Sequence, residues 1–257
     1  MYDLQKASML KRISAALLDG ILLATLVVGI ALLLSLALGY DTYSDRLDGY
    51  YDQYEDEYGV SFDLSTEEYA AMPDADRERL EEAFDAFASD EDVLYVYNLL
   101  FNYTLIIVTF SILIAYLVTE FAVPLILGNG QTVGKKVFGI GLMREDGVKL
   151  TPVQLFARTV LGKYTVETML PVFIVIMILF NVMGILGTAL IGILLIVQLV
   201  LLIVTKTHTP IHDLLARTVA VDITSQLIFD TPEDLLAYKK RLHEEQVQSS
   251  SDDTRLV

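Results

Sequence analysis

The chain has 257 residues, 54% of them hydrophobic, and its mean hydropathy is +0.50. This composition is too apolar for an ordinary soluble domain. The net charge of −16 argues against nucleic acid as a partner, and the absence of cysteine excludes disulfides, zinc–thiolate sites and thiol nucleophiles.

Three long stretches without a charged residue predict membrane spans: Gly20 to Tyr40, Val93 to Thr119 and Thr168 to Thr205. Each exceeds the run of about 20 apolar residues that a helix needs to cross roughly 30 Å of hydrocarbon. Residues 1–39 therefore form the N-terminus and first span. A cleaved signal peptide is the alternative, but the apolar run is longer than the roughly 7 to 15 residues of a signal h-region.

Residues 40–92 form an acidic loop. Between Asp41 and Asp92 there are 19 acidic and 3 basic residues, a balance equal to the net charge of the whole chain. The capping-box pattern from Ser65 to Glu68 predicts one or two surface helices in the second half of the loop. The first half, to about residue 60, alternates tyrosines with acids and is typical of an interfacial, solvated segment.

The second span lies within residues 93–127, and a basic segment occupies 128–167. The glycine-rich stretch from Gly128 to Lys136 lacks the spacing of a phosphate loop. It predicts a tight turn at the membrane surface, with its lysines against lipid phosphates. Residues 137–150 predict a short β-hairpin that turns at Asp146-Gly147.

Thr151 and Pro152 have the pattern of a helix start, with threonine as the cap and proline at the first position. The following residues are amphipathic, with Arg158 and Lys163 on the polar face. We expect this helix to lie along the inner membrane surface.

Residues 168–205 would make a helix about 57 Å long, nearly twice the hydrocarbon thickness. The segment is therefore predicted to cross twice, with a hairpin between Asn181 and Gly187. A single long tilted helix or a re-entrant pair is the competing interpretation. Residues 206–257 form the tail, predicted to be disordered after residue 243.

Basic residues flank the spans at the N-terminus, between the second and third spans, and after the last one. The positive-inside tendency places these segments in the cytoplasm. The sequence thus predicts an all-α, multi-pass protein of the cell membrane with about four transmembrane helices. Both termini are then cytoplasmic, and the acidic loop is extracytoplasmic.

Three charged residues stand out because of their position: Arg12 and Asp19 at the head of the first span, and Asp213 after the last. Arg12 and Asp19 share a helix face but are about 10 Å apart along the axis, so each needs a partner from another helix. Together with Gly130-Gln131-Thr132-Val133-Gly134-Lys135-Lys136 and His212-Asp213-Leu-Leu-Ala-Arg-Thr218, they resemble the RDD family of prokaryotic membrane proteins, named for one arginine and two aspartates.

The resemblance covers about residues 8–222, leaves the acidic loop outside, and implies a fold and transport of an unidentified ligand. Ionisable residues within spans indicate function by default. Asp19 is the leading candidate, because desolvation can raise a carboxyl pKa toward proton exchange, and Glu120 can complete a pair of acids with it. A purely structural network, in which Arg12 bridges Asp213, is the alternative. His212 either forms a proton-relay pair with Asp213 or caps a helix.

Two functions follow. The first is a small transporter or ion exchanger for protons or monovalent cations, oligomeric because four spans enclose little interior. The second is a non-transporting scaffold or accessory protein whose acidic loop binds a partner protein. No catalytic motif or cofactor site is expected, and the three histidines lack metal-ligand spacing. We therefore predict that the protein is not an enzyme.

Overall fold

The computed structural model describes residues 5–179, 184–204 and 210–253. The chain forms two compact units, one from residues 1–26 and 112–257 and the other from residues 27–111. Among the described residues, four helical stretches are long and apolar enough to cross a membrane: Met9–Leu38, Glu91–Leu127, Pro152–Ile178 and Gly184–Leu201. The predicted all-α membrane class is therefore confirmed, and the number of these helical stretches equals the predicted number of spans.

The first two of these stretches contain the first two predicted spans. Helix α1 is Met9–Leu38. The second stretch begins as α5, Glu91–Tyr116, passes through one π-helical segment, η1 (Leu117–Ala122), and ends as α6, Val123–Leu127. Gly128, with φ of +76°, follows α6 and lets the chain turn.

The third stretch begins earlier than the apolar run suggested. Helix α8, Pro152–Phe156, starts with the predicted threonine cap, completed as a capping box by Gln154. It continues without a break through the π-helix η2, Ala157–Met169, into α9, Leu170–Leu179. The predicted separate surface helix is therefore wrong, since its residues form the first turns of the third long helix.

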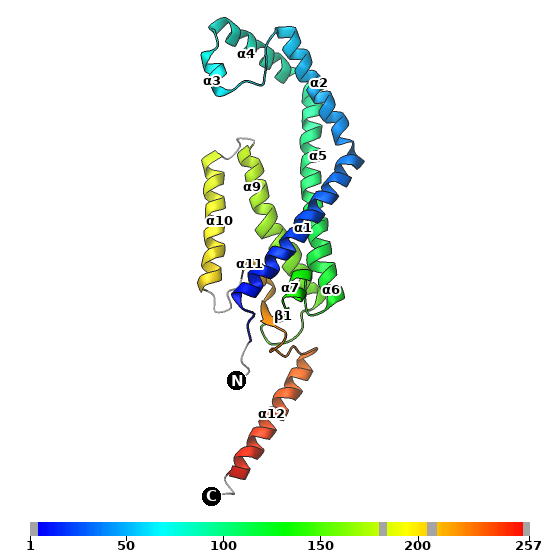
Figure 1. Cartoon of the computed structure of the whole chain (residues 1–257), viewed down its shortest axis with the longest axis vertical. Helices are drawn as coiled ribbons and strands as arrows, with labels where there is room; N and C mark the ends of the chain where they lie inside the picture. Colours follow the sequence, from blue (N-terminus) through cyan, green and yellow to red (C-terminus); the bar gives the residue numbers. More distant parts are fainter. Residues whose placement is uncertain (1–4, 180–183, 205–209, 254–257) are drawn as a thin grey trace. The chain divides into compact units, whose positions relative to one another are not determined.

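Helix α10, Gly184–Val204, packs against α9, and the two lie side by side in Figure 1. Two helices instead of one agree with the prediction that residues 168–205 cross twice. Residues 181–183 of the predicted hairpin lie outside the described residues, and its other four residues form the start of α10.

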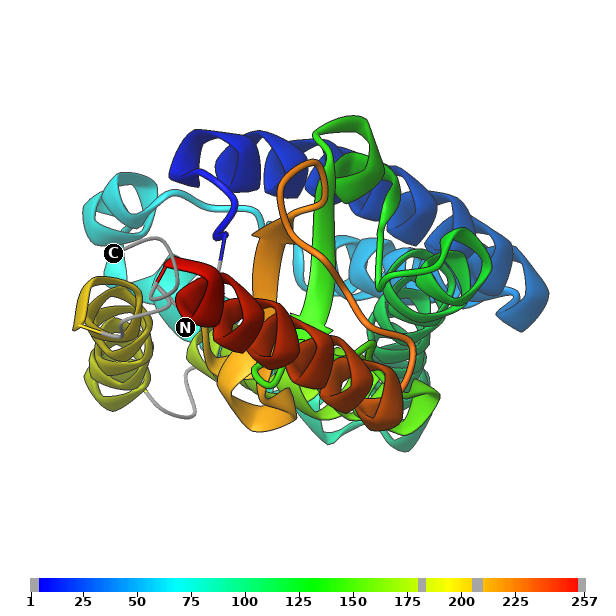
Figure 2. The same ribbon diagram turned by 90° about the horizontal axis from the view of Figure 1, so that it is seen from below.

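A two-stranded antiparallel sheet joins β1, Ile140–Arg144, to β2, Thr218–Asp222 (Figure 2). The predicted turn after Arg144 forms, with Gly147 N–H donating to Arg144 C=O at 3.0 Å, but the local hairpin contributes a single bridge between Met143 and Lys149. The predicted hairpin is thus wrong as the main pairing. When β1 pairs with β2, Ile140 is buried in a small hydrophobic core. Because β2 is far from β1 in the sequence, the residues around β1 give no indication of this pairing.

A short helix precedes each strand of this sheet. Helix α7, Val133–Val137, is capped by the Thr132 hydroxyl, and α11, Ile211–Ala216, ends at Arg217, which has a positive φ of 52°. Helix α11 packs closely against η2. Together α7, η1, η2 and α11 supply the side chains of the site described below.

Helix α12, Pro232–Asp253, follows the sheet. The prediction of disorder after residue 243 is wrong for residues 244–253, which continue this helix. Glu244, Glu245 and Gln246 have good helix propensity and are exposed, so they continue the helix without needing a buried face.

The unit of residues 27–111 contains α2, Tyr40–Tyr58, α3, Thr66–Ala71, and α4, Asp74–Ser89. The capping box at Ser65 forms as predicted. The tyrosine-rich segment forms the helix α2, and its location at the membrane interface stays a prediction. Its tyrosines gain packing partners, since Tyr51 stacks on Phe87 with ring centroids 4.6 Å apart.

Candidate functional site

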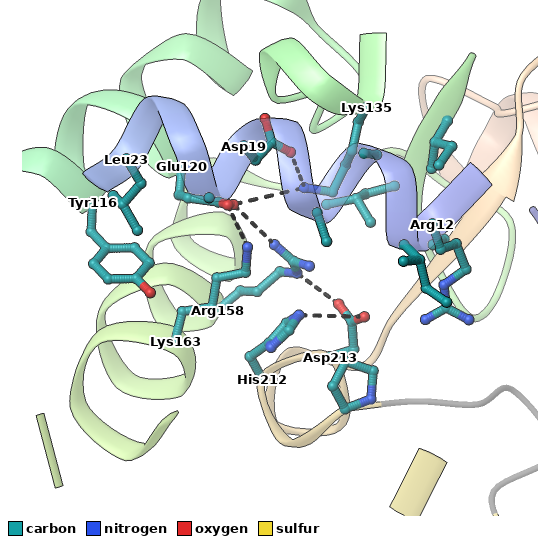
Figure 3. Close-up of a pocket in the computed structure, with 18 of the residues that line it drawn as sticks. Arg12, Asp19, Leu23, Tyr116, Glu120, Lys135, Arg158, Lys163, His212 and Asp213 are labelled. Carbon is teal, nitrogen blue, oxygen red and sulfur yellow. Dashed lines mark hydrogen bonds and ion pairs between the residues drawn. The ribbon is translucent and has the colours of Figure 1, made fainter. Parts of the chain in front are cut away.

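Charged side chains from five elements of the first unit line a cavity of about 400 Å³ (Figure 3). Helix α1 supplies the wall that contains Asp19, and η1, α7, η2 and α11 supply the rest. The acidic, basic and histidine lining residues are Arg12, Asp19, Glu120, Lys135, Arg158, Lys163, His212 and Asp213. We call these residues, with Glu167 behind His212, the charge network.

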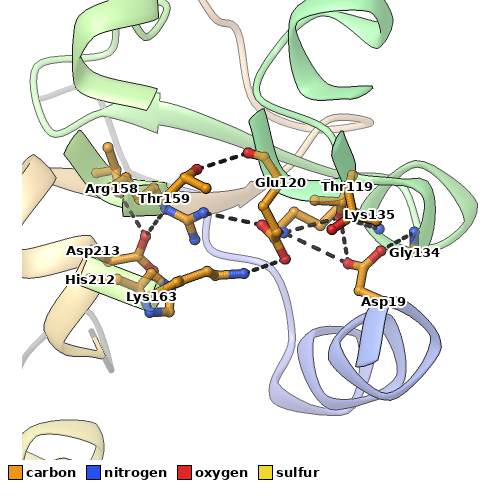
Figure 4. Close-up of polar contacts among 12 residues, drawn as sticks. Asp19, Thr119, Glu120, Gly134, Lys135, Arg158, Thr159, Lys163, His212 and Asp213 are labelled. Atoms are coloured by element: carbon orange, nitrogen blue, oxygen red, sulfur yellow. Dashed lines mark hydrogen bonds and ion pairs between the residues drawn. The ribbon is translucent and has the colours of Figure 1, made fainter. Parts of the chain in front are cut away.

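Asp19 binds the start of helix α7 from the neighbouring helix α1 (Figure 4). Its carboxylate accepts a hydrogen bond from the Thr132 hydroxyl at 2.5 Å and from the Gly134 N–H at 2.7 Å. A negative charge at a helix N-terminus is stabilised by the free N–H groups there. Asp19 thus finds its partner on another element, as predicted.

Gly134 permits this contact because α1 and α7 approach each other closely. A Cβ atom at this position would lie 2.3 Å from the Ala15 carbonyl oxygen and 2.9 Å from the Asp19 carboxyl carbon. The glycine in the Gly-Lys-Lys motif therefore serves contact between helices, which explains the motif without any bound phosphate.

Lys135 lies between two carboxylates. Its Nζ atom is 3.8 Å from Asp19 Oδ2 and 3.8 Å from Glu120 Oε2, and it donates to the Thr132 hydroxyl at 3.1 Å. The prediction that both lysines face lipid phosphates is wrong for Lys135, because the helix turn that begins at Thr132 directs it into the cavity, whereas Lys136 is exposed. Burial lowers the pKa of the Lys135 ammonium to about 8, although Glu120 acts in the opposite direction.

Glu120, proposed above as a second acid beside Asp19, is buried and meets three basic groups. It pairs with Lys163, its Oε2 atom lies 3.7 Å from Arg158 Nη1, and Lys135 approaches from the other side. Glu120 Oε2 and Arg158 Nη1 are both buried without a hydrogen bond among the described residues. Their separation exceeds hydrogen-bond length, so the pair has unused capacity for a small polar ligand.

Arg158 is the partner of Asp213. Its Nε donates to Asp213 Oδ1 at 2.7 Å, and the Thr218 hydroxyl donates to the same oxygen at 2.7 Å. Burial alone would raise the pKa of the Asp213 carboxyl, but the Arg158 guanidinium and the neighbouring His212 hold it below its ordinary value. Arg12 lines the same cavity, and the hypothesis that it bridges Asp213 stays a prediction.

His212 contacts Glu167 more closely than Asp213. Its Nδ1 lies 2.7 Å from Glu167 Oε2 and its backbone N–H donates to Glu167 Oε1 at 2.9 Å, whereas its Nε2 is 3.6 Å from Asp213 Oδ2. The N-cap residue of α11, Pro210, forms no side-chain hydrogen bond, and Glu167 instead accepts from the first turn, so the predicted capping role of the His212 side chain is wrong. Burial lowers the pKa of the imidazole, and the relay role stays a prediction.

Sequence patterns missed Lys135, Arg158, Lys163 and Glu167 as members of the charge network. The α-helical period predicts a polar surface face for Arg158 and Lys163, but both lie in the π-helix η2. Their separation of five residues puts them on one face of a helix whose hydrogen bonds run from i to i+5. That spacing, in a stretch that continues into an apolar run, was the available signal.

Four long apolar helices and a cavity lined by paired charges define a multi-pass membrane protein with a polar interior site. The model of the RDD family matches residues 6–217, and the chain belongs to this family. No curated protein and no solved structure matches the chain. The predicted assignment to the RDD family is confirmed.

Proposed function

We propose that this protein exchanges a monovalent cation for a proton, and that Lys135 competes with the cation for the position between Asp19 and Glu120. The observation that supports this most directly is the placement of the Lys135 ammonium 3.8 Å from a carboxylate oxygen of each acid. With Lys135 protonated, its single positive charge is shared between the two acids. When it releases its proton, the acids are left to attract another cation of the same charge.

The charges balance in this exchange. One proton leaves the Lys135 ammonium as one monovalent cation enters, so the net charge of the cavity is unchanged and the exchange is electroneutral. Burial of the cavity favours this coupling, because an uncompensated charge in a low-dielectric site is costly. The Glu120 oxygen that lacks a hydrogen bond is a ligand atom for the incoming cation.

The helix geometry also supports a functional role. Glu120 lies in one π-helical segment, η1, and Arg158, Lys163 and Glu167 lie in another, η2. These two segments contact each other. Since π-helices are rare and occur frequently at functional sites, their presence on both sides of the charge network favours function over a purely structural role.

The test uses purified full-length protein in phosphatidylcholine liposomes that contain a pH-sensitive dye. A pulse of Na⁺ or K⁺ outside should drive protons out of wild-type vesicles, and a potassium–valinomycin clamp should leave the initial rate unchanged. Asp19→Asn and Glu120→Gln should each lower the initial rate at least about tenfold. Lys136→Ala is the matched control, because this exposed neighbour of Lys135 should leave the rate unchanged.

Absence of proton movement in wild-type vesicles would refute the proposal, provided that the protein is folded by circular dichroism. Full exchange by folded Asp19→Asn would show that the assigned site is wrong. A rate that follows the clamped membrane potential would refute electroneutral exchange.

A further inference from the structure

A second cavity, of about 600 Å³, lies within the unit of residues 27–111 and plays no part in the proposed exchange. Helices α3 and α4 and the segment before α3 line it. Its apolar and aromatic lining consists of Phe62, Leu64, Tyr69, Leu80 and Phe84. The volume is within the range of small-molecule sites, which is roughly 300–1,000 Å³.

Aromatic rings give this cavity a surface that favours cations. Phe62 and Phe84 are in contact, with ring centroids 6.1 Å apart, and Phe84 is 58% exposed. Tyr69 already has the Arg77 guanidinium over its ring, 5.5 Å from the centroid. The faces of such rings carry partial negative charge and attract organic cations within about 6 Å.

Two carboxylates complete the lining. Glu81 and Asp85 are one helical turn apart on α4 and both border the cavity. Neither takes part in an ion pair among the residues that the structure describes. Two arginines of this unit interact elsewhere, since Arg46 donates to Tyr50 and Arg79 pairs with Asp76, whereas Arg77 lies over the Tyr69 ring.

From this arrangement we infer that the cavity between α3 and α4 binds a small amphipathic organic cation, such as a quaternary ammonium with an aryl group. The rings take the apolar part, and Glu81 and Asp85 take the charge. The charge balance of −16 over residues 41–92 reinforces this selection, because it raises the local concentration of any cation. An anion or a neutral ligand of the same shape gains nothing from the carboxylates.

The experiment is a binding titration by calorimetry with the full-length protein in phosphatidylcholine nanodiscs, with empty nanodiscs subtracted. Benzyltrimethylammonium is the probe. Benzyl alcohol keeps the ring without the charge, and tetramethylammonium keeps the charge without the ring. We expect the probe to bind at least about tenfold more tightly than either compound. Its affinity should fall as salt is raised from about 0.01 M to 1 M.

Two variants separate the cavity from the general acidity of the unit. E81Q/D85N should weaken binding of the probe about tenfold. The control E78Q/E82Q removes the same charge with the same spacing from α4, but at exposed positions that do not border the cavity. It should retain nearly the wild-type affinity. Phe84→Ser should also weaken binding about tenfold, and its exposed side chain makes the change compatible with folding.

Equal affinity for benzyl alcohol would overturn the role of the carboxylates, and equal affinity for tetramethylammonium would overturn that of the rings. Equal weakening by E78Q/E82Q and E81Q/D85N would overturn the cavity as a site and leave only a diffuse acidic field. Unchanged affinity in folded Phe84→Ser would do the same. Cation exchange in liposomes is measured separately, so failure here leaves the proposed exchange function intact.

Discussion

The acids of the charge network and the acids of residues 41–92 differ in their surroundings. Asp213 and Glu120 are buried and lie against arginine and lysine side chains, whereas most acids of the loop are exposed. A buried charge requires partners because desolvation costs several kcal/mol, while an exposed charge is stabilised by water and contributes about 0–1 kcal/mol per ion pair. The same residue type therefore controls folding in one region and surface chemistry in the other.

In the acidic unit, aromatic contacts join separate helices, whereas ion pairs have this role in the charge network. Phe87 contacts Tyr51, Tyr54 and Phe62 and is buried among them. Phe87 thus joins α4 to α2, and this apolar contact tolerates the surrounding negative charge because it needs no counter-ion. Four substitutions test this contrast, beginning with the largest expected effect.

Removal of Arg158 should have the largest effect. Its side chain is 2% exposed and bonds Asp213, so Arg158→Met leaves two carboxylates buried with fewer partners. We expect a loss of about 3–5 kcal/mol and strongly reduced recovery of folded protein, measured by thermal unfolding in detergent with circular dichroism. Arg79→Met, at an exposed ion pair in the acidic unit, is the control and should shift stability by less than about 1 kcal/mol. Equal effects of the two variants would contradict the contrast.

Gly134→Ala should have the next largest effect. The added Cβ would lie 2.3 Å from the Ala15 carbonyl oxygen, so α1 and α7 must separate and the hydrogen bonds of Asp19 must lengthen. Overpacking of this kind costs about 1–3 kcal/mol. Thermal unfolding measures this cost, and proton exchange in liposomes should fall with it. Gly29→Ala, with open space around the new Cβ on α1, should be neutral or slightly stabilising. A neutral Gly134→Ala would show that the two helices are not in close contact.

The pH dependence of exchange should report Lys135. Because burial lowers its pKa to about 8, the ammonium occupies the position between the acids below that pH and competes with the cation. The apparent cation affinity should therefore rise by about tenfold per unit as the pH increases toward 8, and level off above it. Lys135→Gln should remove most of this dependence, whereas Lys136→Gln should keep it. Concentration series of Na⁺ at fixed pH values between 6 and 9 give the profile, and a flat wild-type profile would contradict the competition.

Tyr54→Phe should have the smallest effect, because it removes one hydrogen bond in the solvated unit. The Tyr54 hydroxyl donates to Asp90 Oδ2 at 2.8 Å, and this bond raises the tyrosine pKa to about 12. The neutral phenol is favoured by folding, so its contribution is complete below pH 10 and is lost as the pH rises through 12. We expect Tyr54→Phe to lower the melting temperature slightly at neutral pH, and the control Tyr58→Phe to leave it unchanged. The difference in absorbance between wild type and Tyr54→Phe should titrate with a midpoint near 12. An ordinary midpoint near 10 would contradict the bond.

The spans and the capping residues were predictable because they depend on local sequence. The length of an uncharged run sets the number of crossings, and Ser65 and Thr151 cap the helices that follow them, as their patterns predict. Asp19 was identified as needing a partner from another helix, since helical geometry places Arg12 too far along the axis. These inferences use distances of one or two helical turns.

The partners in the site were not predictable in the same way. Arg158 joins Asp213 across 55 residues of sequence, and β1 pairs with β2 across a still longer separation, so no local period reveals either contact. Side chains that share a face in the π-helix η2 differ from those that would share one in an α-helix. Lys163 therefore contacts Glu120 and does not lie on the predicted polar surface face.

By itself, the sequence determined that this is a membrane protein with four long apolar helices and that its net charge resides in one loop, because hydrophobic length and charge counts need no knowledge of contacts. The tertiary structure alone decided which charges neutralise one another. Burial makes an unpaired charge costly, and the packing of η1, η2, α7 and α11 determines which opposite charge is within reach. Lys135 thus lies between Asp19 and Glu120 because α7 packs against α1.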